Sequence, residues 1–337
     1  MKEYKNYSLL HHNTFRLDVK ADSFVEYDTL EELQAFLSDG PENVPIFHIG
    51  KGSNLLFTGD YHGIVLHSRL QTVETVTENQ DDIILRVGAG MNWDEFVVNC
   101  IAHGYYGLEN LSLIPGEVGA SAVQNIGAYG EEAAGSIVAV ETVELATGHR
   151  KRITREECGY AYRYSHFKGP WRGRYAVTHV EYRLHKLFCP NLEYEPIRLY
   201  AETVGRNLSP LQIREKIIEI RKAKLPDPKE LGNAGSFFMN PVITEAEYRR
   251  LQHENPQTNV PSYQMGKNIK IPAAWLIEQA GWKGRRLGKA GVYGKQALVL
   301  VNLGGATAED IIRLSRRICE DVEKRFGITI QPEVNWI

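Results

Sequence analysis

The segment 114–130, IPGEVGASAVQNIGAYG, has a composition that points to ligand chemistry. It places four glycines among small residues and also carries Gln124, Asn125 and Tyr129. Because glycine tolerates positive φ and has no Cβ, successive backbone N–H groups can converge on phosphates or on a flat ring. The segment fits neither an amphipathic helix nor an alternating strand. We interpret it as a cofactor-binding loop; a tight connection between two strands is the alternative, but few such connections run this long.

Two more glycine loops precede this segment. The apolar run 44–49 ends in Gly50-Lys51-Gly52-Ser53-Asn54, and the strand-like run 83–87 ends in Gly88-Ala89-Gly90 before helical spacing over 92–103. Neither is a Rossmann fingerprint, because Leu55 and Trp93 stand where its third glycine is needed. No Gly-Lys pair has the glycine five positions earlier or the following Ser or Thr of a Walker loop.

These loops and several later motifs resemble one known family, the UDP-N-acetylenolpyruvoylglucosamine reductases. The resemblance spans nearly the whole chain in family order, and eight motifs at compatible spacing make coincidence very unlikely. The matching segments are 52–56 (GSNLL), 113–116 (LIPG), 124–130 (QNIGAYG), 160–168 (YAYRYSHFK), 224–228 (KLPDP), 232–238 (GNAGSFF), 296–300 (QALVL) and 331–334 (QPEV).

The resemblance implies an α/β fold with two parts. The first is a vanillyl-alcohol-oxidase-type FAD-binding domain, and the second is a smaller C-terminal α/β domain that caps the substrate. It also implies an NADPH-dependent flavoenzyme that reduces the enolpyruvyl ether of UDP-N-acetylglucosamine to the lactyl ether, giving UDP-N-acetylmuramate for peptidoglycan synthesis. NADPH delivers hydride to FAD, and reduced FAD delivers it to the terminal vinyl carbon.

Hydride addition leaves negative charge on the neighbouring carbon and the carboxylate, so the site needs a cationic or hydrogen-bonding clamp and a proton donor. The family's catalytic positions match Arg163, Ser236 and Glu333. Arg163 would bind the substrate carboxylate with its planar fork. Ser236 would protonate the enolate carbon, and Glu333, in a site sealed from water, could donate to the enolate. Without the resemblance, a surface ion pair, a turn serine and an exposed terminal glutamate are the ordinary interpretations.

The resemblance also assigns binding residues. Tyr129 and Tyr162 match residues that line the family's active site. Tyr194 matches a tyrosine on a mobile loop that closes over the diphosphate, and Lys224 and Asn240 match diphosphate contacts. Gln296 lies where the family binds the sugar nucleotide. FAD is expected to bind Gly50, Lys51, Gly52, Ser53, Asn54, Leu55, Pro115, Gly116, Gly119, Ala120, Gln124, Asn125, Gly127 and Ala128.

Composition bounds the remaining possibilities. The chain has 337 residues, 43% hydrophobic and 24% charged, enough for two or three ordinary cores. A net charge of −3 argues against a generic nucleic-acid binder, and no apolar run reaches the roughly 20 residues of a membrane helix. The polar N-terminus is not of signal-peptide type. We expect a cytoplasmic monomer that binds a small-molecule substrate, and neither nucleic acid nor a membrane.

The four cysteines show no metal-ligand spacing. Cys100, Cys158, Cys189 and Cys319 are far apart in sequence, so we expect free thiols and no metal site.

The coarse layout predicts an FAD-binding domain over 15–188 with two subdomains, a linker with the tyrosine loop over 189–209, and a substrate-binding domain over 210–337 whose tail returns to the active site. Helices are expected at 29–38, 93–103, 272–279 and 308–326, with another opened by Pro210, and an apolar strand at 297–301.

Three positions depart from the family pattern. Met239 stands where the family commonly has Lys, which makes Lys224 the more important cation. Lys51 replaces a usual glycine, and either adds a charge beside the FAD pyrophosphate or points outward. Arg16 replaces another glycine, without an explanation from the sequence.

Two other functions stay open at this level. One is an FAD oxidase of the same fold acting on a sugar or a hydroxy acid. Such oxidases often tether FAD through a histidine in the first glycine loop, and residues 50–54 contain none, so we expect non-covalent FAD. The other is a flavin-free sugar-nucleotide binding protein, which the complete set of Arg163, Ser236 and Glu333 disfavours.

Overall fold

The chain divides into two compact units in the computed structural model, which describes residues 1–40, 44–205 and 207–337. The first unit consists of Met1–Ser8, Lys20–Lys51 and Tyr61–Arg221. The second unit consists of Leu9–Val19, Gly52–Asp60 and Lys222–Ile337. No helix in the described ranges is long and apolar enough to cross a membrane.

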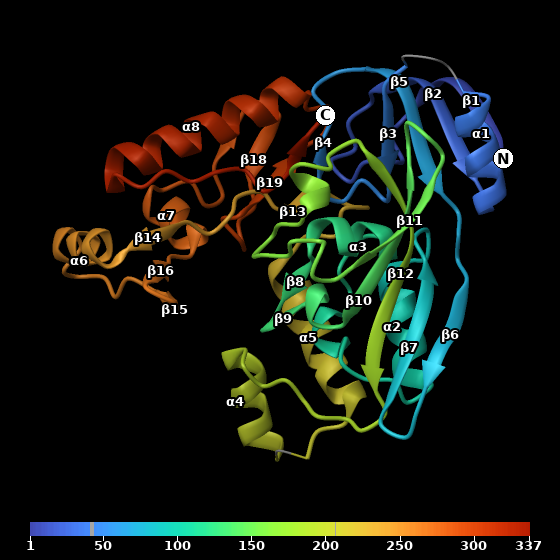
Figure 1. Ribbon diagram of the computed structural model, residues 1–337. Coiled ribbons are helices and arrows are strands. Elements are labelled where there is room, and N and C mark those ends of the chain that lie inside the picture. The colour runs from blue at the N-terminus through green and yellow to red at the C-terminus, as the bar shows by residue number, and fades with distance from the viewer. Residues whose placement is uncertain (41–43, 206) are drawn as a thin grey trace. The chain divides into compact units, whose positions relative to one another are not determined.

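Two sheets form the first unit (Figure 1). The four-stranded sheet has the order β1 (Lys2–Ser8), β2 (Lys20–Tyr27), β5 (Tyr61–Ser68), β3 (Ile46–Ile49), with α1 (Leu30–Ser38) packed on β2. The antiparallel five-stranded sheet has the order β11 (Arg150–Thr154), β10 (Ile137–Glu144), β12 (Tyr175–His185), β7 (Asp82–Gly88), β6 (Val73–Glu78).

The two faces of the five-stranded sheet differ. On one face, inward side chains such as Leu85, Val140 and Val180 pack with α2 (Trp93–Ala102) and α3 (Val118–Gln124) into a continuous core. The strands alternate buried and less buried positions, as expected for a sheet with one covered face.

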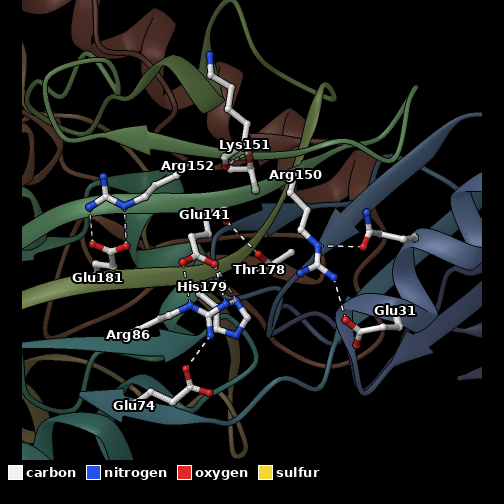
Figure 2. A network of polar contacts seen from close by, with 12 residues as sticks. Glu31, Glu74, Arg86, Glu141, Arg150, Lys151, Arg152, Thr178, His179 and Glu181 are labelled. Atoms are coloured by element: carbon white, nitrogen blue, oxygen red, sulfur yellow. Dashed lines mark hydrogen bonds and ion pairs between the residues drawn. The ribbon is translucent and has the colours of Figure 1, made fainter. Parts of the chain in front are cut away.

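The other face carries a network of ion pairs (Figure 2). Arg86 on β7 donates two hydrogen bonds to Glu141, of 2.8 and 2.7 Å, and a third of 2.9 Å to Glu74. Arg86 Nη2 also lies 3.0 Å from Nδ1 of the buried His179. Arg is always protonated, so Nδ1 accepts this hydrogen bond and the His179 ring is neutral.

Two helices follow the five-stranded sheet, α4 (Glu195–Val204) and α5 (Pro210–Lys224). Their apolar side chains, including Ile197, Ile213 and Ile217, share a small core. The α4 helix lies inside the segment that we expected to be a linker.

The second unit is built around two smaller sheets. One has the order β13 (Gly232–Ser236), β19 (Val299–Asn302), β18 (Ala290–Val292), β17 (Arg286–Leu287); the other has the order β14 (Val242–Thr244), β16 (Asn268–Lys270), β15 (Tyr263–Met265). Helices α6 (Glu245–Glu254), α7 (Ala273–Gln279) and α8 (Ala308–Phe326) complete its core. A short parallel pair joins β4 (Leu55–Leu56) to β20 (Asn335–Trp336).

Segments 9–19 and 52–60 belong to the second unit because their polar groups bond there. Asn302 Nδ2 donates to Phe15 O at 2.9 Å, Asn233 N donates to Thr14 O at 2.9 Å, and Asn335 N donates to Asn54 O at 3.1 Å. The division therefore falls within the first glycine loop and at the end of α5, whereas our predicted boundary lies at 189–209. The assignment of a flavin-binding and a substrate-capping role to the two parts stays a prediction.

The expected helices at 29–38, 93–103, 272–279 and 308–326 are present. The segment 114–130, which we interpreted as a cofactor-binding loop, contains a short helix, since α3 occupies Val118–Gln124. Glycine and alanine let this short helix pack closely, and it ends at Asn125, whose φ of 45° is left-handed. The described cysteines are free thiols, with Cys100 and Cys158 buried.

The neutral state of His179 predicts a pH dependence of stability. Burial first, and then the charge of Arg86, lower the pKa of His179 to about 4. Between pH 6.5 and 4 the unfolded chain binds a proton that the folded chain does not, so stability rises with pH across this window. In urea unfolding, the free energy of unfolding of the wild type should fall by about 2–3 kcal/mol between pH 7 and pH 4.5. His179→Gln should not show this fall.

The Gln variant retains an acceptor for Arg86 but does not titrate in this range. The exposed His149 supplies the control, since His149→Gln should keep the wild-type slope. Equal slopes for all three proteins would show that His179 is not the titrating group.

Candidate functional site

Two of the three glycine loops meet in the first unit through direct backbone contact. Gly119 N donates to Ala89 O and Val118 N donates to Met91 O, both at 2.9 Å. A Cβ on Gly119 would lie 2.8 Å from Ala89 Cβ, closer than real Cβ atoms come. The loop that carries Pro115, Gly116 and Ala120 is therefore fixed against the 88–91 turn.

Asn125 connects this loop to the tyrosine-rich segment. Its side chain is fully buried, and Nδ2 donates to Glu132 Oε2 at 2.9 Å and to Ala161 O at 3.0 Å. Its Oδ1 accepts from Ala134 N at 3.0 Å. These three hydrogen bonds are all made to groups of the chain, so Asn125 supports the loop. The preceding Gln124 is half-buried.

Arg163 lies beside the end of the same loop. Its Nη2 donates to Gly127 O at 2.5 Å, and its guanidinium carbon lies 5.2 Å from the centre of the Tyr162 ring. A Cβ on Gly127 would lie 2.7 Å from Arg163 Nη1, so a larger residue here would displace the guanidinium. The predicted carboxylate-binding arginine and the predicted flavin-binding Gly127 and Ala128 are thus neighbours.

Tyr129 forms the next part of the group. Its ring packs edge-on against Tyr194 with centroids 5.0 Å apart, and the guanidinium of Arg221 lies 5.9 Å from its centre. Asn191 Nδ2 donates to Gly130 O at 3.1 Å, which ties the tyrosine loop to the glycine loop. Burial raises the pKa of Tyr129, and the charge of Arg221 opposes this shift.

Arg221 was not among our predicted site residues. Burial lowers its pKa, and its Nε has no hydrogen-bond acceptor in the described part of the chain. A buried cation with an unsatisfied donor is costly unless something pairs with it. The sequence signal that could have found Arg221 is its helical spacing from Arg214, one heptad earlier on α5. Arg214 forms an ion pair with Asp94 through two hydrogen bonds of 2.6 and 2.9 Å.

The backbone is strained where these residues meet. Asn125, Tyr129 and Arg163 have φ of 45°, 54° and 55°, three of the six non-glycine residues with positive φ in the described ranges. Such conformations cost roughly 1–3 kcal/mol each and cluster at functional sites. All three are predicted site residues.

The second unit holds the remainder of the first glycine loop. Gly52 has φ of 63°, and a Cβ there would lie 2.0 Å from His12 O, so glycine is required. Asn54 Nδ2 lies 3.5 Å from Glu333 O, and Leu55 pairs with Asn335 in the β4–β20 ladder. Ser53 is half-buried between them.

Ser236 and Glu333 are brought together by strand-like pairing of the tail. Ser236 is the last residue of β13, paired with Val299. The next residue, Phe237, accepts a hydrogen bond of 2.7 Å from Glu333 N, and Met239 N donates to Gln331 O at 2.9 Å. Ile328, Ile330 and Val334 are buried, so the tail is packed into the second unit.

The predicted nucleotide-binding residues lie in the same unit. Asn240 Oδ1 accepts from Ala273 N at 2.9 Å, and Gln296 Oε1 accepts a longer bond of 3.4 Å from Leu298 N. Lys224 is exposed at the end of α5. Met239 follows the paired Phe238 and is half-buried.

The structure explains one of the three departures. Arg16 has φ of 57°, the conformation that a glycine adopts easily, and its Nη1 donates to Lys229 O at 3.0 Å. The turn is held by buried Asn13, whose Nδ2 donates to Leu9 O and Leu17 O at 2.8 and 2.9 Å and whose Oδ1 accepts from Leu17 N at 2.9 Å. Lys51 is exposed.

The predicted residues therefore form two groups, each assembled within its own unit. The first unit supplies Gly50, Lys51, the 115–129 positions, Tyr162, Arg163 and Tyr194; the second supplies Gly52, Ser53, Asn54, Leu55, Lys224, Ser236, Asn240, Gln296 and Glu333. The first group presents partly exposed, side-chain-poor backbone next to a cation, which fits a flat, phosphate-bearing cofactor. The second brings the backbones of Ser236 and Glu333 close together, and a hydroxyl and a carboxyl are groups that can donate protons.

Comparison with known families agrees with this arrangement. Residues 21–154 match an FAD binding domain, and residues 227–337 match the C-terminal domain of UDP-N-acetylenolpyruvoylglucosamine reductase. The solved UDP-N-acetylenolpyruvylglucosamine reductase of Thermus caldophilus has the same fold, with a TM-score of 0.67 at 24% identity over 99% of this chain and 98% of that one. The predicted fold class and the predicted cofactor, FAD, are confirmed.

Curated relatives match the full length. A UDP-N-acetylenolpyruvoylglucosamine reductase of Bacteroides fragilis strain YCH46 is 52% identical over 99% of both chains. One of Porphyromonas gingivalis strain ATCC 33277 is 45% identical over 99% of this chain and 98% of its own length. This chain belongs to the UDP-N-acetylenolpyruvoylglucosamine reductase family.

Proposed function

We propose that the chain is an NADPH-dependent flavoenzyme that reduces the enolpyruvyl ether of UDP-N-acetylglucosamine, giving UDP-N-acetylmuramate. The observation that carries this proposal is the pairing of 237–239 with 331–333, which makes Ser236 and Glu333 neighbours in a chain that matches its relatives from end to end. Peptidoglycan precursor synthesis is the corresponding cellular role.

FAD, when bound, supplies hydride transfer between NADPH and the vinyl carbon. In the first unit, the loop residues Gly50, Gly116, Gly119, Gln124 and Gly127 would hold it. Their support by Ala89 and Asn125 would keep the loop backbone in place, so that binding needs no rearrangement.

Arg163 would bind the substrate carboxylate. Its guanidinium is positioned by the hydrogen bond to Gly127 O and by the Tyr162 ring, and a planar guanidinium can bind both oxygens of a carboxylate. As charge spreads from the carbon into the carboxylate, this fixed cation would stabilise the transition state more than the ground state.

Ser236 would donate its hydroxyl proton to the carbon next to the carboxylate. The hydroxyl is a weak acid in water, so the step requires alignment and brief stabilisation of the serine oxygen. Glu333, whose backbone pairs with Phe237, would contact the developing enolate. Gly235 has a left-handed conformation, and its N donates a hydrogen bond of 2.9 Å to Asn233 Oδ1. This bond fixes the backbone that presents Ser236.

Further predicted residues would bind the substrate. Tyr129, Tyr194 and the half-buried Arg221 would contact it, and Lys224, Asn240 and Gln296 would bind the UDP portion. This set favours an anionic sugar nucleotide over an uncharged substrate, because cations recur in it.

The proton-donor role of Ser236 predicts a split between the two half-reactions. In Ser236→Ala, NADPH should reduce the bound flavin at nearly the wild-type rate, since no proton from Ser236 is needed there. Reoxidation by the enolpyruvyl substrate should slow by at least about a hundredfold. Stopped-flow absorbance of the flavin measures both rates separately.

The exposed Ser262, on the same unit, gives a control, and Ser262→Ala should leave both rates unchanged. If Ser236→Ala slowed both half-reactions equally, Ser236 would be a structural residue and not the proton donor.

A second prediction concerns the attachment of FAD. Residues 50–54 contain no histidine for a covalent link, so precipitation with acid should leave all the yellow flavin in the supernatant. Absorbance of the two fractions at the flavin band measures this. Flavin that stays on the precipitated chain would instead support the oxidase alternative.

A further inference from the structure

A largely buried group of charged side chains, outside the residues considered so far, joins strands β2 and β5 to the start of α3. His67 on β5 contacts two carboxylates: Nε2 lies 3.2 Å from Glu117 Oε1, and Nδ1 lies 3.3 Å from Glu26 Oε1. The three side chains are only 15%, 5% and 13% exposed. Neither family resemblance nor the proposed mechanism uses them.

The geometry requires the protonated form of the ring. A neutral imidazole has one N–H and one acceptor nitrogen, so one of these two contacts would place lone pairs against each other. The imidazolium donates at both nitrogens and satisfies both carboxylates. Burial disfavours the charge, but the hydrogen bond and attraction of Glu117, with those of Glu26, outweigh it and raise the pKa of His67.

Glu117 connects this cluster to the predicted cofactor loops. It follows Gly116, and its backbone pairs with Asn92 beside the 88–90 loop. Its carboxylate lies so close to Gly50 that a Cβ there would be 3.1 Å from Oε2. Glu117 thus touches the 50–54 loop with its side chain, while its backbone belongs to the segment 114–130.

We propose that His67 is a positioning residue for FAD, which as an imidazolium holds Glu117 between the two glycine loops and cancels its negative charge. This proposal rests on the assignment of those loops to FAD. The pyrophosphate of FAD is anionic, so an uncancelled carboxylate at this place would weaken its binding. FAD affinity should therefore fall as pH rises and His67 loses its proton.

The charged and titratable groups around His67 do not account for this pH dependence of FAD affinity. Glu26 and Glu117 supply negative charge, and Arg69 pairs with Glu26 at 3.4 Å. On the neighbouring strands, burial and the charge of His67 lower the pKa of His48 to about 3, and burial raises the pKa of Tyr27 and of Tyr7. His48 and the two tyrosines are therefore neutral at pH 6–9.

The test is the dissociation constant of FAD between pH 6 and 9, measured from the free-flavin fluorescence of diluted holoenzyme. In the wild type it should rise on the order of tenfold across this range. His67→Gln should change by less than about twofold, because its amide does not titrate. His62 lies on the same strand but is 84% exposed, and His62→Gln should follow the wild type.

Glu117→Gln provides a second variant in case His67→Gln does not fold. It removes the carboxylate whose charge the proton cancels, so at pH 9 it should bind FAD no more weakly than the wild type. A wild-type dissociation constant that is flat from pH 6 to 9, or a full slope in His67→Gln, would overturn the proposal. Failure to retain FAD at any pH would instead contradict the loop assignment and the proposed function with it.

Discussion

Backbone lies directly against backbone around the 88–90 loop, and the arrangement of the first unit depends on this contact. A Cβ on Gly88 would lie 2.4 Å from Leu70 O, and one on Gly90 would lie 2.3 Å from Ser68 O. Together with Gly119 against Ala89, these glycines let the end of β5, the end of β7 and the start of α3 share one small volume. Any side chain here would push the loops apart, and the support of Arg163 by Gly127 would shift with them.

In the second unit, hydrogen-bonded pairing of backbone segments holds the candidate site residues in position. The tail runs beside both the end of β13 and the segment 54–58, so one short stretch positions Glu333, Ser236 and Asn54. Buried Ile330 and Val334 anchor it on either side. A catalytic group near the end of a chain would ordinarily fray, and this packing is what makes a precise role for Glu333 physically reasonable.

Local signals explain which elements the sequence could predict. Helix α8 lies at its predicted bounds, where Thr307 and Asp310 form a capping box and Gly327 ends the helix in the left-handed region. Helix α3 escaped prediction because its glycine and alanine residues have no amphipathic pattern, and α4 was hidden in a presumed linker. The pairing of 54–58 with the tail is a contact between distant segments that no local pattern encodes.

For the candidate site, too, some features could be predicted from the sequence and others could be seen only in the structure. Motifs assigned its residues through a family resemblance, but the contact of Arg163 with Gly127, the left-handed turn of Arg16 and the burial of Arg221 against Tyr129 are products of folding. The pair of His67 and Glu117, fifty positions apart, likewise became visible only in the structure.

The central claim is that reduced flavin on this chain passes its electrons to an enolpyruvyl sugar nucleotide. The direct measurement is anaerobic: one equivalent of NADPH is added to the yellow holoenzyme, the loss of flavin absorbance is recorded, and UDP-N-acetylglucosamine enolpyruvate is then added. Our account predicts that the absorbance returns with that substrate in the absence of air. Flavin that stays bleached until oxygen is admitted would contradict it.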